Sequence, residues 1–156
     1  MTDMDKAVAD TAGYEGYKAQ AYKDSRGLWT AGEGTCLETN PIGGKDWKFL
    51  LDNGMITLNI SGAGARFLLR GKLAADLRDL AAQYAGFAGL PDLAQTLLLE
   101  MAYQLGTDKL LEFVTFNALV RAHRFADAAG DGRTTAWYKE TPARAEKILS
   151  QLEGIQ

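Results

Sequence analysis

The sequence predicts an α+β protein in which a small antiparallel β lobe accompanies a larger helical lobe. Between residues 17 and 40, short apolar segments alternate with turns rich in Gly and Asp, which is typical of a small hairpin sheet. From about residue 61 onwards, apolar residues recur at helical spacing. The 156 residues are about one domain's worth of chain, so we expect a single domain over 1–156.

A short helix is expected over residues 3–16. Met4, Val8 and Ala12 are four residues apart and therefore share one face of this helix. Glu15 follows at the C-terminal end of the same face, which directs its side chain toward the interior rather than into open solvent.

Three short strands are expected next, at about 19–22, 28–31 and 35–37. The first two are joined by a turn that begins at Asp24 and ends at Gly27, residue types that favour these turn positions. The segment Gly32-Glu33-Gly34 is expected to form the second turn. We therefore expect a small antiparallel sheet.

Residues 41–60 are punctuated by Gly, Asn and Asp, and we expect an irregular segment there. A long helix follows at about 61–82, marked by a leucine stripe on one face. The next helix starts at Pro91 as its first residue and ends at Gly106, and its apolar run places it at the centre of the core. Shorter helices at about 108–113, 116–123 and 125–129 precede a last helix that begins Thr141-Pro142.

The composition excludes several classes of protein. A net charge of −3 and a pI of about 5.2 argue against a nucleic-acid binder. The sequence has no apolar run of about 18 residues and an acidic start unlike a secretory signal, so we expect no membrane insertion and cytoplasmic synthesis without a signal peptide. One Cys and one His leave no intramolecular disulfide and no plausible zinc set. We expect a monomer, and we expect no metal or cofactor because acid–base work by two carboxyl groups requires none.

Two acids and a hydroxyl form the candidate catalytic group. Asp24 follows Glu15 by nine residues, and Thr30 follows Asp24 by six. Glycoside hydrolysis uses two carboxyl groups in different surroundings, one protonated and one ionised. Burial raises a carboxyl pKa, so the half-buried Glu15 is expected to be the acid, whereas Asp24 on a turn stays ionised.

The segments EGYKAQAYKDSRGLWTAGEGT and WYKETPARA resemble the phage-type lysozymes, whose catalytic end has a Glu, eight residues, an Asp, five residues and a Thr. A second block, QLG…F…AA…WY.ETPARA, resembles the family's C-terminal half. The resemblance covers nearly the whole chain and is weakest between about 39 and 60. It implies a β lobe at about 17–60, a connecting helix at about 61–82, and a helical lobe at 83–156 that includes the N-terminal helix, with a cleft between the lobes.

The resemblance also implies an activity: hydrolysis of the β-1,4 bond between N-acetylmuramic acid and N-acetylglucosamine in bacterial peptidoglycan, with inversion. Glu15 would be the general acid, Asp24 would activate water, and Thr30 would help to hold that water. Arg144 matches an arginine that supports the catalytic Glu. The family's sugar-contacting positions fall here on Tyr103, Gln104, Cys36, Phe116 and Asp131, of which the last three differ in residue type. Glu33 stands where the family has an apolar residue.

Other readings of the same residues remain open. A lytic transglycosylase needs one acid and no water-activating Asp, and would leave 1,6-anhydromuramic ends. A catalytically silent wall-binding module would bind glycan without turnover. The role expected is that of a phage or prophage endolysin acting on the cell wall after release by a holin, with a virion protein or a secreted antibacterial effector or bacteriocin domain as the alternatives.

Overall fold

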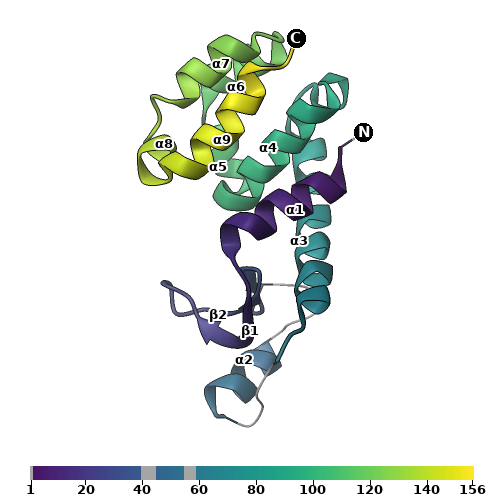
Figure 1. Ribbon diagram of the computed structural model, residues 1–156, viewed down its shortest axis with the longest axis vertical. Helices are drawn as coiled ribbons and strands as arrows, with labels where there is room; N and C mark the ends of the chain where they lie inside the picture. The colour runs from purple at the N-terminus through teal and green to yellow at the C-terminus, as the bar shows by residue number, and fades with distance from the viewer. Residues whose placement is uncertain (1, 40–44, 55–58) are drawn as a thin grey trace. The chain divides into compact units, whose positions relative to one another are not determined.

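The computed structural model describes residues 2–39, 45–54 and 59–156 (Figure 1). A helix, a three-stranded antiparallel sheet, a long helix and a set of shorter helices follow one another along the chain. The predicted α+β fold class is confirmed.

The chain forms two compact units. Residues 8–72 make up the β unit, and residues 1–7 together with 73–156 make up the helical unit. The division falls within two helices, α1 (Met4–Glu15) and α3 (Gly62–Gln83). Both helices were expected, and their ends lie within two residues of the predicted ones.

The sheet of the β unit has the order β1 (Lys18–Lys23), β2 (Trp29–Gly32) and β3 (Thr35–Cys36). Tyr22 lies opposite Thr30, and the pairing is irregular between Lys18 and Tyr22. The three strands predicted from the turn residues are therefore present and antiparallel.

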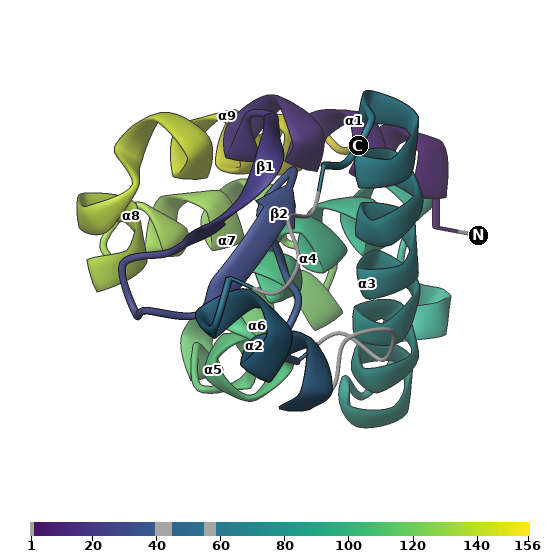
Figure 2. The ribbon, with the colours of Figure 1, turned by 90° about the horizontal axis from the view of Figure 1, so that it is seen from below.

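Helix α2 (Lys45–Asp52) occupies a stretch that we expected to be irregular. Gly54, with a φ of +63°, lies just beyond its end, so the glycine that suggested an irregular segment instead follows a helix. Leu51 packs with Ala31 and Leu37 in the core of the β unit, and Figure 2 shows α2 beside β2.

Hydrogen bonds to the Asp52 carboxylate join α2 to the sheet. One carboxylate oxygen accepts hydrogen bonds from Lys23 Nζ at 2.6 Å and Trp29 Nε1 at 2.7 Å, and the other accepts one from Lys48 Nζ at 2.6 Å. These donors, Lys23 foremost, hold the pKa of Asp52 well below its usual range. The face of the sheet that carries Lys23 and Trp29 is therefore the face that packs on α2.

The helical unit is built around α4 (Asp92–Leu105), in which every residue from Ala94 to Ala102 is buried. Pro91 is its N-cap rather than its first helical residue. Around α4 lie η1 (Phe87–Gly89), α5 (Thr107–Leu111), α6 (Val114–Arg121), α7 (Phe125–Gly132), α8 (Ala136–Glu140) and α9 (Pro142–Glu153) (Figure 1). Helix α8 was not predicted.

The start of the chain is tied to α4 through polar contacts. Thr2 donates to Gln95 Oε1 at 3.0 Å, and the backbone N–H of Asp3 donates to Thr96 Oγ1 at 3.1 Å. These bonds satisfy the side chains of Gln95 and Thr96, which are buried polar residues of α4.

Acid is expected to remove one stabilising contact of the helical unit. Glu146 accepts hydrogen bonds from Arg133 and Ser150, and these, Arg133 first, lower its pKa from 4.5 to about 2. A carboxyl with a depressed pKa in the folded state stabilises fully above its unfolded pKa, and this stabilisation is lost as the pH falls through the folded pKa.

Wild type should therefore melt a few degrees above Glu146→Gln at neutral pH, and this difference should shrink between about pH 4.5 and about pH 2. Melting followed by circular dichroism measures it. Glu140→Gln, at an exposed position on α8, is the control and should melt like wild type throughout. A difference that is unchanged at about pH 2 would contradict the assignment.

Candidate active site

Glu15 is the last residue of α1, and its carboxylate lies against the turn between β2 and β3. Gly16 follows with a φ of +67°, the left-handed conformation that commonly ends a helix. The Glu15 side chain is half-buried. A methyl group on Gly34 would come within 2.6 Å of Glu15 Oε2, so the turn approaches the carboxylate closely only because position 34 is glycine.

Asp24 opens the turn between β1 and β2. Its Oδ1 accepts hydrogen bonds from the backbone N–H of Arg26 at 2.8 Å and of Leu28 at 2.9 Å. The Arg26 guanidinium lies 3.4 Å from Oδ2. These contacts lower the pKa of Asp24, with the backbone hydrogen bond from Leu28 as the largest cause. Asp24 is therefore ionised at neutral pH.

Thr30 lies on β2, opposite Tyr22 of β1. Its side chain is buried, and its hydroxyl donates to the carbonyl of Leu28 at 3.3 Å. Because that bond uses the hydroxyl proton, the oxygen lone pairs are what Thr30 can offer to a further donor.

Tyr22 has a relation to each of the three predicted catalytic residues: two affect its pKa and the third is its partner across the sheet. Its pKa is raised by burial and then by the negative charges of Glu15 and Asp24. Both carboxylates therefore act electrostatically on the Tyr22 phenol, and Thr30 lies opposite Tyr22 on β2. Glu15, Asp24 and Thr30 all belong to the β unit.

Our sequence reasoning gave Tyr22 no role. The alternation of side chains along a strand could have indicated a role for Tyr22. Tyr22 and Asp24 are two residues apart at the end of one strand, so they fall on the same side of it. Lys18 was also missed, and its ammonium group lies 3.8 Å from the centroid of the Tyr22 ring. The sheet thus has one face toward α2 and another that presents Tyr22.

The predicted sugar contacts are divided between the two units. Cys36 is half-buried on β3 of the β unit, opposite Thr30. In the helical unit, the predicted sugar contacts Tyr103 and Gln104 on α4 and Asp131 on α7 are half-buried, as is the predicted supporting residue Arg144 in the first turn of α9. Phe116 requires a correction. It is completely buried in the core of the helical unit, so its ring has no surface to offer a sugar.

Gln104 makes hydrogen bonds within the helical unit. Its Oε1 accepts a hydrogen bond from Trp137 Nε1 at 2.9 Å, and its Nε2 donates to Thr141 Oγ1 at 3.2 Å. Thr141 Oγ1 in turn donates to the carbonyl of Trp137 at 3.0 Å. The amide therefore joins α4 to α8 and to the start of α9, and its orientation is fixed.

Comparison with known proteins gives a match over nearly the whole chain. No protein-family model matches the chain. Among curated proteins, the chain is similar to "Probable T4-type lysozyme 1" of Dictyostelium discoideum, with 24% identity over 166 residues that cover 96% of this chain and 95% of that protein. The name of that protein agrees with the resemblance to the phage-type lysozymes. Since the match runs through nearly all of both chains, it concerns the whole fold rather than one motif.

In this protein, negative charge is concentrated in the helical unit. The β unit has seven Asp or Glu and eight Lys or Arg, a net charge of +1, whereas the helical unit has 13 and nine, a net charge of −4. The acidic pI therefore does not describe the unit that contains Glu15, Asp24 and Thr30.

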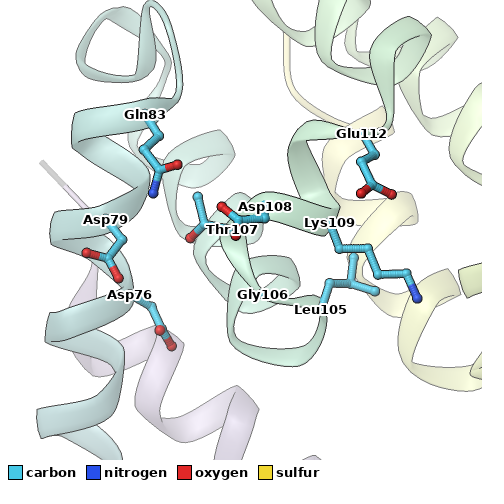
Figure 3. Close-up of a pocket in the computed structure, with 9 residues that line it drawn as sticks. All are labelled: Asp76, Asp79, Gln83, Leu105, Gly106, Thr107, Asp108, Lys109 and Glu112. Atoms are coloured by element: carbon cyan, nitrogen blue, oxygen red, sulfur yellow. The ribbon is translucent and has the colours of Figure 1, made fainter.

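Part of that negative charge surrounds a pocket of about 650 Å³ in the helical unit. The pocket lies between α3 and the junction of α4 with α5, and none of the predicted site residues lines it (Figure 3). It has four acidic side chains and one lysine, and it is lined by Asp76, Asp79, Gln83, Leu105, Gly106, Thr107, Asp108, Lys109 and Glu112.

The described residues contain neither a candidate metal site nor a candidate membrane span. Among the described residues, no three His, Cys, Asp or Glu side chains are grouped so as to hold a metal ion. Within the same residues, no helix has both the length and the apolar character needed to cross a bilayer.

Proposed function

We propose that this protein is a muramidase that hydrolyses the β-1,4 bond between N-acetylmuramic acid and N-acetylglucosamine in bacterial peptidoglycan. The observation that carries the proposal is that two carboxylates lie at turns of one sheet in the β unit: Glu15 against the β2–β3 turn and Asp24 in the β1–β2 turn. The similarity to a T4-type lysozyme over nearly the whole chain supports it. Two carboxyl groups in different surroundings are the chemical requirement for glycoside hydrolysis.

In the proposed reaction, Glu15 donates its proton to the glycosidic oxygen as the bond to the anomeric carbon breaks. Asp24 accepts a proton from a water molecule that attacks the same carbon from the opposite face of the sugar. Thr30 accepts a hydrogen bond from that water and so helps to orient it. The product is a free sugar end with inverted configuration, and proton exchange with solvent then restores both carboxyl groups.

The remaining predicted site residues are included in the proposal because of the family resemblance. Tyr103, Gln104, Cys36 and Asp131 are proposed sugar contacts, and Arg144 is a proposed supporting residue. Phe116 is left out because it is buried.

The direct test is the loss of turbidity of chloroform-treated Gram-negative cell walls, followed with the purified protein from about pH 4 to about pH 8. We expect clearing, with new reducing ends on muramic acid. Folded protein that clears no walls at any of these pH values would overturn the proposal. Clearing that yields 1,6-anhydromuramic ends would identify a lytic transglycosylase instead.

Replacing Asp24 with asparagine should distinguish a hydrolase, which needs the Asp24 carboxylate, from a lytic transglycosylase or a silent wall-binding module, which do not. Asparagine keeps the oxygen that accepts the backbone N–H groups of the turn, but it cannot take a proton from water. We expect kcat on soluble, uncrosslinked glycan strands to fall about 100-fold, the low end for general acid–base catalysis.

Ser25→Ala, in the same turn and exposed, is the matched control for Asp24→Asn and should keep the wild-type rate. An Asp24→Asn protein that turns over glycan at the wild-type rate would contradict the role given to Asp24.

We also propose that the activity serves cell lysis, as in a phage or prophage endolysin. A lysozyme made inside a bacterium reaches the wall only after the inner membrane is breached. Cells that express the chain should therefore stay turbid until chloroform is added and then clear, whereas cells that express Glu15→Gln should stay turbid. Clearing before chloroform is added would contradict release through a separate membrane lesion.

A further inference from the structure

The turn between β2 and β3 contacts two helices of the β unit. Its first and last residues, Gly32 and Gly34, have φ values of +64° and +75°. A methyl group on Gly32 would lie 2.7 Å from the Cβ of Ala65 on α3, and one on Gly34 would lie 2.6 Å from Glu15 Oε2. The turn is therefore packed between the end of α1 and the first turns of α3.

Between these two glycines lies Glu33, a buried charge. Its side chain is only 6% exposed, and its Oε1 lies 3.6 Å from Nε of Arg66, which is 57% exposed on α3. Arg66 follows Ala65 directly, so two adjacent residues of α3 restrain the turn, one by contact and one by charge.

Burying a carboxylate at position 33 is energetically unfavourable compared with burying an apolar side chain. Removing a charge from water costs free energy that an apolar side chain of similar size would not incur, and a buried ion pair often contributes nothing to net stability. Where such pairs are retained, one explanation is that they fix a single arrangement of the chain.

We propose that Glu33 is a positioning residue, whose ion pair with Arg66 holds the β2–β3 turn on α3 and thereby fixes the surface against which the Glu15 carboxylate lies. The inference rests on the proposed function, because its consequence is measured as glycan hydrolysis. Without the pair, the turn can shift and Gly34 with it. A displacement of about 1 Å at a catalytic group can cost about 100-fold in rate, so a partial shift should cost about tenfold.

The test compares Glu33→Gln, Arg66→Gln and the double variant on soluble, uncrosslinked glycan strands. We expect each single variant to lower kcat about tenfold with KM changed less than about twofold. The double variant should be no slower than the slower single one, because both substitutions break the same interaction. Arg66→Lys, which keeps a cation within reach of Glu33, should retain most of the wild-type kcat.

Melting temperatures are measured in parallel, since a merely structural role would lower the melting temperature and leave the kcat of the folded protein unchanged. Glu38→Gln is the matched control. Glu38 is a second poorly exposed glutamate of the β unit, but it accepts a hydrogen bond from the backbone N–H of Trp29 at 2.9 Å and lies near Lys48 on α2. It should keep the wild-type kcat.

Several outcomes would overturn the inference. An active wild type with Glu33→Gln or Arg66→Gln at the wild-type kcat would refute it and leave the proposed function standing. Multiplicative losses in the double variant, or an Arg66→Lys protein as slow as Arg66→Gln, would also refute it. A folded wild type that hydrolyses no glycan would refute the proposed function, and the inference with it.

Discussion

Glu15→Gln is expected to lower kcat for glycan hydrolysis about 1000-fold and to abolish the clearing of cell walls. Glutamine has nearly the shape of glutamate and fits the same space against Gly34. It has no acidic proton to transfer to the glycosidic oxygen, so only the chemical step is removed. The kcat on soluble glycan strands, with products separated by mass, measures the effect.

The control for Glu15→Gln is Glu112→Gln, at an exposed position on the acidic pocket of the helical unit, which should be fully active. Circular dichroism should show Glu15→Gln folded, and it should still bind glycan. A folded Glu15→Gln protein with more than about a tenth of the wild-type kcat would exclude Glu15 as the general acid.

Gly34→Ala is expected to damage both stability and activity. At a φ of +75°, a side chain costs about 1–2 kcal/mol of backbone strain. The new methyl group would also lie 2.6 Å from Glu15 Oε2, so either the turn or the carboxylate must move. Because a displacement of about 1 Å can cost about 100-fold, we expect kcat to fall more than about 100-fold.

Gly54→Ala provides the comparison for Gly34→Ala. Gly54 has a similar φ of +63°, but a methyl group there meets no atom within 4 Å. It should show the loss of stability, measured by urea unfolding, without the loss of kcat. Equal activities of the two variants would show that Gly34 matters only for its backbone conformation.

Much of the β unit could be predicted because its signals are local. The turn from Asp24 to Gly27 and the apolar face that leads to Glu15 each depend on residues a few positions apart. Asp24 and Thr30 are separated by one hairpin, and Glu15 ends the preceding helix, so short-range rules suffice to place all three in the β unit.

The remaining features depend on packing between distant segments. Glu33 and Arg66 are far apart in sequence, and nothing in either neighbourhood predicts that they meet. Phe116 matches a sugar-contacting family position by alignment, yet α6 packs it into the core. Helix α2 was missed because its flanking glycines resemble those of a loop, while its contact with Ala31 and Leu37 is tertiary.

The opposite net charges of the two units bear on how this protein would approach an anionic polymer. Far from the polymer, the net charge of −3 is repulsive. Within a Debye length, about 8 Å at physiological ionic strength, each unit responds to the polymer separately, and the β unit at +1 is favoured over the helical unit at −4. Electrostatics would thus favour encounters through the β unit, which contains the proposed catalytic residues. Added salt would weaken the long-range repulsion, so moderate ionic strength should speed association with the wall, opposite to the behaviour of a strongly basic enzyme.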